Sequence, residues 1–377
     1  MLRLLRKPLL SLVVLLALLL VGEVLVRALT NTEPPIVMRD ATLGRRFLTS
    51  YDAEVYDEES EREVHVRTTR DGFRGPDRPY TPAPDTTRIA VLGDSMIAAL
   101  AMEEAETLCG QLEARLNGDG GDESYEVLNF GVLGSSTAQE MLIYEQVAQR
   151  YEPDVVVLSF FSGNDLADNH RGLTSNPRIY FDLDEEGQLV QEPYSVSRSQ
   201  VSAWLNRNSR LYVWQKQVLR NNKIVKADPA KTMRPADWTF ASDPPPNVER
   251  AWEITAALIA RLKVEVEANG ARLVLLHVPG SKQICGDLYD AVVARAGEAG
   301  ASFERDNPDT RAKEIAEALE LPLLSLTPVL RAAAPSDSAA VQEEWLYYGG
   351  TMHWNERANA LAAEALHAFL GELQRGA

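Results

Sequence analysis

Five short apolar runs are the feature that most restricts the fold of this 377-residue chain. They occupy residues 89–92, 127–130, 155–158, 273–276 and 321–324. Continuous runs of this kind, unlike alternating ones, predict strands that are buried on both faces of a sheet. Pro322 lies in the last run, so this strand is expected at a sheet edge, or the proline at the strand's start.

Helix-like stretches separate these runs along the chain. They cover residues 106–117, 137–150, 247–268 and 309–320, followed by a C-terminal stretch in which Leu361, Ala365, Phe369 and Leu373 form one apolar stripe. Strands that alternate with helices predict a parallel sheet covered on both faces. The expected fold is therefore α/β, a three-layer α/β/α sandwich around a central, mostly parallel five-stranded sheet, with sites at the carboxyl ends of the strands.

The chain divides into three parts by sequence texture. Residues 1–30 are apolar. Residues 31–85 are rich in proline and charge and are expected to be an extracytoplasmic spacer with a few short strands, such as the alternating Val64 and Val66 stretch, and residues 86–377 are expected to be the main domain. Residues 170–246 interrupt the strand–helix alternation and are predicted to be an insertion. It is predicted to begin with a hairpin that turns at Glu186-Gly187.

The first thirty residues have the pattern of an export signal. Arg3, Arg6 and Lys7 precede an apolar run that continues to Val26 and contains only one acid, Glu23. This length is enough to cross a bilayer, and no small-residue cleavage site follows. An uncleaved single-pass anchor is expected, with the N-terminus in the cytoplasm and the catalytic domain in the periplasm. Cleavage of the segment and secretion of the rest is the alternative.

Composition excludes some partners and cofactors. The chain has 38 Lys+Arg against 55 Asp+Glu, a formal charge of −17, so nucleic acid is not an expected partner. No cluster of His, Cys and carboxylates has metal-ligand spacing, and neither a metal nor another cofactor is expected. Cys109 and Cys285 are the two cysteines, and both a disulfide and buried free thiols remain open. The sequence does not predict an oligomeric state.

Polar residues follow the predicted strands at the positions where a catalytic site would form. Ser95 lies on a Gly93-Asp94-Ser95 turn after the first strand, which is how a nucleophilic serine is presented. Gly134 lies in a glycine-rich loop after the second strand, and Asn164 follows the third. Backbone N–H groups in such a loop and an asparagine side chain can donate to an oxyanion.

His353 is the expected general base of the site. It lies just ahead of the C-terminal helix, with Asn355 as a suitable N-cap. His277, at the end of the fourth strand, is the one serious rival, although a packed core histidine is its simpler interpretation.

These ordered blocks resemble the SGNH hydrolase superfamily, also called GDSL-type esterases. The resemblance covers roughly residues 70–372, and the Gly72-Phe73-Arg74 element is similar to that of membrane-anchored bacterial members. It implies that Ser95 is the nucleophile and His353 the base. The N–H groups of Ser95 and Gly134 and the side chain of Asn164 would form the oxyanion hole.

The chain departs from the family pattern at one position. The family usually has an aspartate three residues before the histidine, and here Gly350 occupies that place. A Ser–His dyad could suffice, with a backbone carbonyl orienting His353. Otherwise Asp165, Glu343 or Glu344 could supply the acid, or the activity is lost.

Three functions follow from these residues. The first is a membrane-anchored serine esterase that hydrolyses ester groups, above all O-acetyl groups, on an extracytoplasmic carbohydrate or related substrate. The second is a polysaccharide O-acetyltransferase that uses the same acyl-enzyme. The third is a non-catalytic glycan-binding or assembly module on a degenerate scaffold, which is motivated by the missing aspartate alone.

Overall fold

The computed structural model describes residues 2–30, 32, 35–118, 123–174, 176–195, 200–224, 234–298, 301–335, 345–349 and 352–375. The chain forms two compact units. The first unit comprises Met1–Ile36 and Val196–Thr232, and the second comprises Val37–Ser195 and Met233–Ala377.

The predicted five-stranded sheet lies at the centre of the second unit. Its strands are β5 (Thr86–Gly93), β6 (Ser124–Gly131), β7 (Val155–Phe161), β10 (Arg272–Val278) and β11 (Leu323–Ser325). They pair in the order β11-β10-β7-β5-β6, and every pair is parallel. The strand after Pro322 lies at an edge of the sheet, as the proline predicts.

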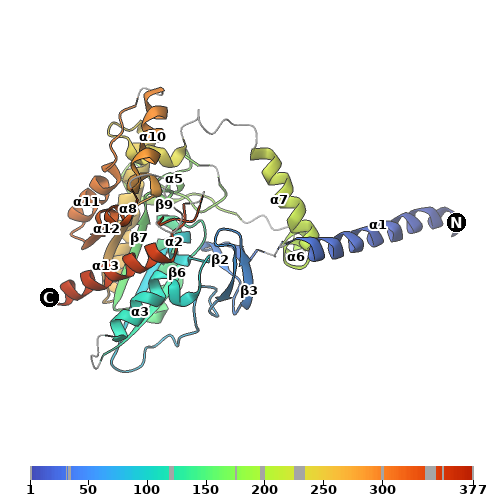
Figure 1. Ribbon diagram of the computed structural model, residues 1–377, viewed down its shortest axis with the longest axis horizontal. Coiled ribbons are helices and arrows are strands. Elements are labelled where there is room, and N and C mark those ends of the chain that lie inside the picture. Colours follow the sequence, from blue (N-terminus) through green and yellow to red (C-terminus); the bar gives the residue numbers. More distant parts are fainter. Residues whose placement is uncertain are drawn as a thin grey trace. The chain divides into compact units, whose positions relative to one another are not determined.

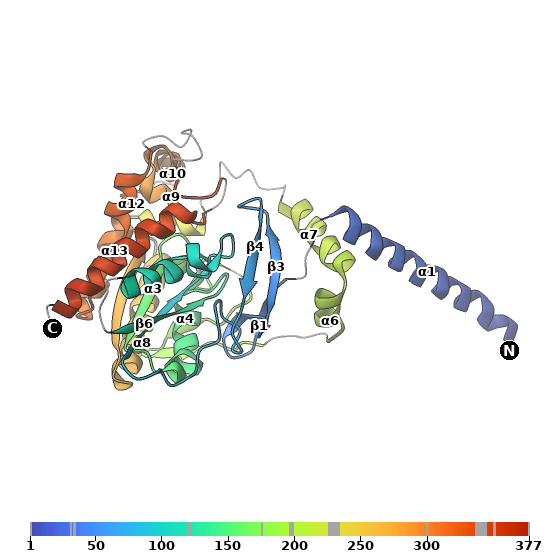
Figure 2. The same cartoon turned by 60° about the horizontal axis from the view of Figure 1, so that its bottom comes forward.

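Helices cover both faces of the sheet and complete the predicted sandwich (Figures 1 and 2). One face packs on α3 (Leu108–Gly118), α12 (Thr327–Ala333) and α13 (Glu356–Arg375). The other packs on α4 (Thr137–Gln146), α8 (Pro246–Ala268) and α11 (Asn307–Ala318). Side chains alternate between the two faces along β5, and both sets are buried. This double burial is the physical reason for the continuous apolar run.

From residue 37 onwards, the segment expected to be a spacer with a few short strands is part of the folded second unit. Two antiparallel hairpins, β1 (Val37–Asp40) with β2 (Gly44–Phe47) and β3 (Asp52–Asp57) with β4 (Arg62–Arg67), belong to the second unit. Phe47, Val64, Val66 and Phe73 are at most 1% exposed. The apolar residues are few and isolated among charges, so the sequence pattern resembles that of a solvated linker.

The remaining elements of the second unit are short, apart from one helix. They are α2 (Ser95–Ala98), η1 (Glu104–Glu106), η2 (Ala148–Tyr151), α5 (Asp165–Asp168), β8 (Phe181–Leu183), β9 (Leu189–Gln191), η3 (Pro235–Phe240), α9 (Ser281–Ile284) and α10 (Gly286–Glu298). Strands β8 and β9 form the hairpin predicted at the start of the insertion.

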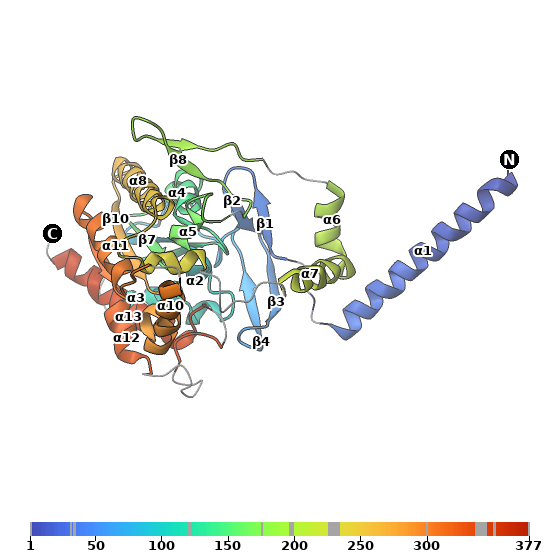
Figure 3. The same ribbon diagram turned by 90° about the horizontal axis from the view of Figure 1, so that it is seen from above.

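The first unit consists of α1 (Leu2–Leu29), α6 (Gln200–Asn208) and α7 (Arg210–Ile224), so its chain comes from the N-terminus and from the middle of the insertion (Figure 3). Among the described residues, α1 is the one helix that is long and apolar enough to cross a membrane. Its window Leu10–Leu29 has a mean hydropathy of 2.6.

Candidate active site

Ser95 begins α2, directly after β5, on a turn that requires glycine at its first position. A Cβ on Gly93 would lie 2.3 Å from Cγ1 of Ile97, so a larger residue would displace α2. Asp94 caps the helix, since its Oδ1 accepts the Met96 N–H at 2.8 Å. The Ser95 hydroxyl is thereby fixed at the carboxyl end of the sheet, where the N–H of Ser95 has no acceptor among the described residues.

His353 lies between the Ser95 hydroxyl and a carboxylate. Its Nε2 is 2.9 Å from Ser95 Oγ, and its Nδ1 is 2.9 and 2.8 Å from Glu59 Oε1 and Oε2. An ionised carboxylate only accepts hydrogen bonds, so the Nδ1 proton points to Glu59 and Nε2 is left to accept the Ser95 proton. This chain of hydrogen bonds has the geometry of a serine–histidine–acid triad.

The acid comes from the tip of the β3–β4 hairpin, a residue that the sequence analysis did not single out. Asp57 shapes this tip, because its Oδ1 accepts hydrogen bonds from the N–H of Glu59 and of Ser60 at 3.0 and 2.8 Å. Arg62, the first residue of β4, donates to Glu106 and to Glu356, at 2.6 Å in each case. The hairpin is thereby joined to η1 and to the start of α13, close in sequence to His353.

The loop that carries His353 is held by its own backbone and by the cap of α13. The Tyr348 N–H donates to the His353 carbonyl at 3.0 Å, and Tyr347 and Trp354 form an isolated antiparallel bridge. Asn355 Oδ1 accepts the Ala358 N–H at 3.1 Å, which is the predicted N-cap. The imidazole is therefore placed by fixed elements on both sides.

Glu59 also sets the protonation of the imidazole. Burial lowers the pKa of His353, but the hydrogen bond and the charge of Glu59, together with the charge of Asp94, outweigh it and raise the pKa above its usual value. The arrangement favours the imidazolium, which is the species formed when the histidine removes the serine proton.

Donor groups for an oxyanion surround the serine. Asn164 is the N-cap residue of α5, and its Nδ2 donates one hydrogen to Asp94 Oδ2 at 3.0 Å, which leaves the second available. Gly134 has a φ of +68°, and a Cβ there would lie 2.5 Å from Nη1 of Arg45. Within the described part of the chain, the Gly134 N–H has no acceptor. Each of the three predicted donors thus has a hydrogen left for a ligand.

Three buried carboxyl groups lie behind the serine. Asp94, Glu140 and Asp165 are each at most 1% exposed. Burial raises the pKa of Asp94 to about 6, although hydrogen bonds from Met96 and Asn164 favour its charged form. Burial and the neighbouring acids hold the pKa values of Glu140 and Asp165 well above the usual range. Neither oxygen of Glu140 has a hydrogen-bond partner among the described residues.

The acids expected from the sequence do not include the one that contacts His353. Asp165 is turned away, since its Oδ2 accepts the Phe161 N–H at 2.7 Å and its Oδ1 is buried without a partner among the described residues. Asp165 is the first residue of α5, directly after the turn that follows β7, and its carboxylate is directed back toward β7. Glu343 and Glu344, like Gly350, lie outside the described residues.

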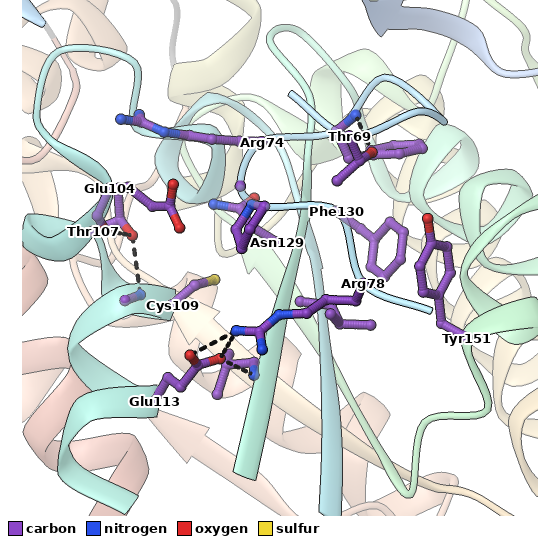
Figure 4. A pocket seen from close by; sticks show the side chains of 16 residues that line it. Thr69, Arg74, Arg78, Glu104, Thr107, Cys109, Glu113, Asn129, Phe130 and Tyr151 are labelled. Atoms are coloured by element: carbon purple, nitrogen blue, oxygen red, sulfur yellow. Dashed lines mark hydrogen bonds and ion pairs between the residues drawn. The ribbon is translucent and has the colours of Figure 1, made fainter. Parts of the chain in front are cut away.

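Arg74 gives the Gly72-Phe73-Arg74 element a structural role next to the helix that begins at Ser95. Its buried guanidinium donates to the carbonyls of Ala98, Ala99 and Met102, which end α2 and the loop after it. Burial lowers the pKa of Arg74 to about 10. A cavity of about 50 Å³ beside it is lined by Asn129 and Cys109, among others (Figure 4).

The other sequence candidates lie apart from the triad. His277 is fully buried, and its Nδ1 bonds Asp309 Oδ1 at 3.0 Å, so it is a core histidine. Cys109 and Cys285 are both buried and free, which decides between the two alternatives for them. Among the described residues no group of three or more His, Cys, Asp or Glu could hold a metal ion.

A cavity of about 430 Å³ adjoins the loop that carries His353. Trp345, Tyr347 and Tyr348 line it, together with Lys282 and Arg295. Both cations bind the buried carboxylate of Asp237, so the cavity wall keeps an excess of positive charge.

The sequence matches no protein-family model and no curated protein. It is similar in structure to an acetylxylan esterase from Geobacillus stearothermophilus, with 12% identity, 76% of this chain and 94% of that chain covered, and a TM-score of 0.41. It is also similar to a lipase/acylhydrolase from Enterococcus faecalis (13% identity, 75% and 94% covered, TM-score 0.37) and to a GDSL-like lipase from Bacteroides thetaiotaomicron (11%, 78% and 89%, TM-score 0.36). Similarity at this level says nothing about the substrate or the activity of this chain.

Proposed function

We propose that this protein is a serine ester hydrolase of the SGNH type that acts through a covalent acyl-enzyme on Ser95. The observation that carries the proposal is the continuous hydrogen-bonded chain from Ser95 Oγ through His353 to Glu59. Glu59 supplies the acid of the triad. The lack of an aspartate at position 350, which is Gly350, was the reason to consider a non-catalytic scaffold.

The geometry supports a two-step mechanism. His353 Nε2 removes the proton as Ser95 Oγ attacks the ester carbonyl, and Glu59 stabilises the imidazolium that results. The same imidazolium then gives its proton to the departing alcohol oxygen, which leaves the acyl group on Ser95. A water molecule, deprotonated by His353, then attacks the acyl carbon. The bond between Ser95 Oγ and the acyl group breaks, Oγ takes the proton back from the imidazolium, and the acid is released.

The oxyanion formed in each step would be bound by three donors. They are the N–H groups of Ser95 and Gly134 and the remaining hydrogen of Asn164 Nδ2. Asp94 acts as a positioning residue here, since its Oδ2 holds the other hydrogen of that amide and so fixes the plane of the side chain. Removing one such donor typically costs about 10²–10³ in rate.

The cavity that adjoins the loop carrying His353 supports a carbohydrate ester as substrate. Aromatic side chains such as Trp345 and Tyr348 offer faces on which a sugar ring can pack, and the cavity is large enough for a sugar residue. We propose O-acetyl groups as the scissile esters, and the excess of cations at Lys282 and Arg295 favours sugars that carry a carboxylate.

The helix α1 supports placement of the enzyme at a membrane. Its apolar window is 20 residues long, enough to span the hydrocarbon core of a bilayer, and the cations precede it. We propose a single-pass anchor with the catalytic unit on the extracytoplasmic, periplasmic side. Secretion after cleavage is the alternative. Cell fractionation tests the two: full-length chain in the membrane fraction supports the anchor, and a shortened, soluble product supports secretion.

A fluorophosphonate probe tests the proposal directly. The wild-type chain is expected to be labelled at Ser95, and Ser95→Ala to lose the label. Ser124→Ala, on an exposed serine at the start of β6, is the matched control and should label as the wild type does. Equal labelling of wild type and Ser95→Ala, or none of either, would refute the proposal.

The fate of the acyl group separates hydrolysis from transfer. An acetylated glycan is incubated with the enzyme in the presence and absence of an unacetylated acceptor. Free acetate as the product in both reactions supports the esterase, whereas acetylated acceptor shows that the same triad serves an O-acetyltransferase.

A further inference from the structure

Helices α6 and α7 expose several large apolar side chains, which is unusual for a surface in contact with water. Val201 and Trp204, about one turn apart on α6, are 66% and 62% exposed. On α7, Trp214 and Val218 are one turn apart and partly exposed, and Leu219 is 61% exposed. Tryptophan in such a position is typical of the interface between a bilayer and water.

The same helices are basic in an acidic protein. Residues 200–224 contain five Lys or Arg and no Asp or Glu, a formal charge of +5 in a chain whose total is −17. Basic residues combined with exposed tryptophan and aliphatic side chains are the composition of helices that lie on anionic membranes.

A carboxylate of the membrane-spanning helix holds the start of α7. Glu23 of α1 accepts hydrogen bonds from Ser209 Oγ at 2.8 Å and from the N–H groups of Arg210 and Leu211, each at 3.0 Å. A negative group at a helix N-terminus is favourable because it pairs the free N–H groups and the helix dipole. An acid near the end of an apolar span is otherwise costly, and this contact gives it four partners including Arg27.

Further contacts join the two helices to each other and to α1. Arg27 of α1 donates to the Asn208 carbonyl at the end of α6, at 3.3 Å. Ser202 and Tyr212 are 2.9 Å apart at their hydroxyls, and Lys216 Nζ donates to Asn206 Oδ1 at 3.0 Å. The helix pair is thus fixed to the C-terminal end of α1, where its apolar window ends.

We propose that α6 and α7 form a membrane-interface element, which lies on the anionic lipid surface where α1 leaves the bilayer. The proposal rests on α1 being a membrane anchor, as proposed above. The occupant of the exposed apolar face is the lipid bilayer because this face adjoins α1 at the end of its apolar span, and because its charge is opposite to that of anionic headgroups. The element would keep the enzyme at the membrane surface through contacts additional to the anchor.

Quenching of tryptophan fluorescence by lipid tests this inference. The full chain is reconstituted into vesicles of phosphatidylcholine and phosphatidylglycerol that carry bromine-labelled acyl chains. Helix α1 has no tryptophan, so quenching reports on other parts of the chain. The double variant Trp204→Phe, Trp214→Phe is expected to lose most of the lipid-quenched signal, and Trp238→Phe, in the catalytic unit, is expected to retain it.

Three other outcomes of this experiment would each overturn the inference, and they differ in what they say about the anchor. A chain that stays in the vesicles after carbonate extraction, but whose lipid quenching is the same in the double variant, overturns this inference and leaves the anchor intact. A chain that is extracted overturns the anchor and this inference together. Tryptophans protected from both lipid and aqueous acrylamide quenching would mean that a protein covers the face, which also overturns it.

A second measurement addresses the contact with α1. Glu23→Ala is expected to raise amide hydrogen exchange at Arg210 and Leu211 by at least about tenfold, since their acceptor is lost. Glu185→Ala, at an exposed turn, is the control. Unchanged exchange in Glu23→Ala would show that Glu23 does not hold α7.

Discussion

Glu59 and His353 lie 294 residues apart in the chain and 2.8 Å apart at Oε2 and Nδ1. The acid therefore reaches the candidate active site from a hairpin that precedes the first strand of the sheet, whereas the resemblance described above implies an acid three residues before the histidine. In this structure the carboxylate that contacts Nδ1 of His353 comes from the β3–β4 hairpin. The triad depends on geometry rather than on sequence position.

Replacing Glu59 tests this contact. We expect Glu59→Gln to lower kcat by about 10²–10⁴, because the imidazolium loses its counter-charge. His353 must be neutral to accept a proton, and Glu59 raises its pKa, so the acid limb of the kcat/KM profile should move to lower pH in the variant. Glu58→Gln removes the same charge from the same turn and should leave rate and profile unchanged. Equal rates in the two variants would contradict the assignment.

Replacing Asn164 tests its proposed role as an oxyanion donor. We expect Asn164→Ala to lower kcat by about 10²–10³ with little change in KM, because the donor acts on charge that develops in the transition state. Steady-state kinetics on an acetyl ester measure both constants. Asn176→Ala, an exposed asparagine in the same unit, is the control. A rise in KM with unchanged kcat would instead assign Asn164 to ground-state binding.

The buried carboxyl groups predict how stability depends on pH. Their pKa values are higher in the folded than in the unfolded chain, so the folded state binds more protons and stability is lost as pH rises through the folded pKa, about 6 for Asp94. Glu140→Gln mimics the protonated form of one group. We expect it to raise the free energy of unfolding at pH 8 by roughly 1–3 kcal/mol and to change nothing at pH 4.

Urea unfolding at the two pH values measures this effect. Glu185→Gln, on an exposed turn, should leave the pH dependence as it is in the wild type. A variant Glu140→Gln that is less stable at pH 8 would mean that the ionised carboxylate has a favourable partner.

Arg74 is expected to stabilise the end of α2 through its guanidinium geometry. Lysine carries the charge but cannot reach three carbonyls in the same way, so Arg74→Lys should lower the free energy of unfolding by about 1–3 kcal/mol. Arg70→Lys alters an exposed ion pair with Asp77 and should have little effect. Similar unfolding midpoints for the two variants would argue against the role of Arg74.

The two cysteines are expected to remain thiols in the isolated protein. Cys109 and Cys285 are buried and unpaired, so alkylation should proceed only after unfolding and should add two groups without a reductant. Mass spectrometry counts the groups. A chain that takes up none until it is reduced would show that the cysteines have paired.

The sheet and the Ser95–His353 pair could be predicted because each leaves a local signal. A strand buried on both faces must be apolar throughout, and the carboxyl ends of parallel strands share one edge. Glu59 leaves no such signal. It lies in a run of charges, 57–63, and only contacts over long sequence separation, such as Arg62 with Glu356, bring it to the site. Alternation in β4 around Val64 and Val66 was the one hint that the segment is folded.

The contact of Glu23 with α7 also bears on the proposed alternative in which α1 is cleaved from the chain. A leader peptidase that cut the chain after α1 would remove the carboxylate that binds the Arg210 and Leu211 amides, together with Arg27. The insertion helices of the released product would then begin with unpaired backbone groups and an uncovered apolar face. Cleavage after α1 would thus release a product in which the start of α7 has lost the contacts that hold it.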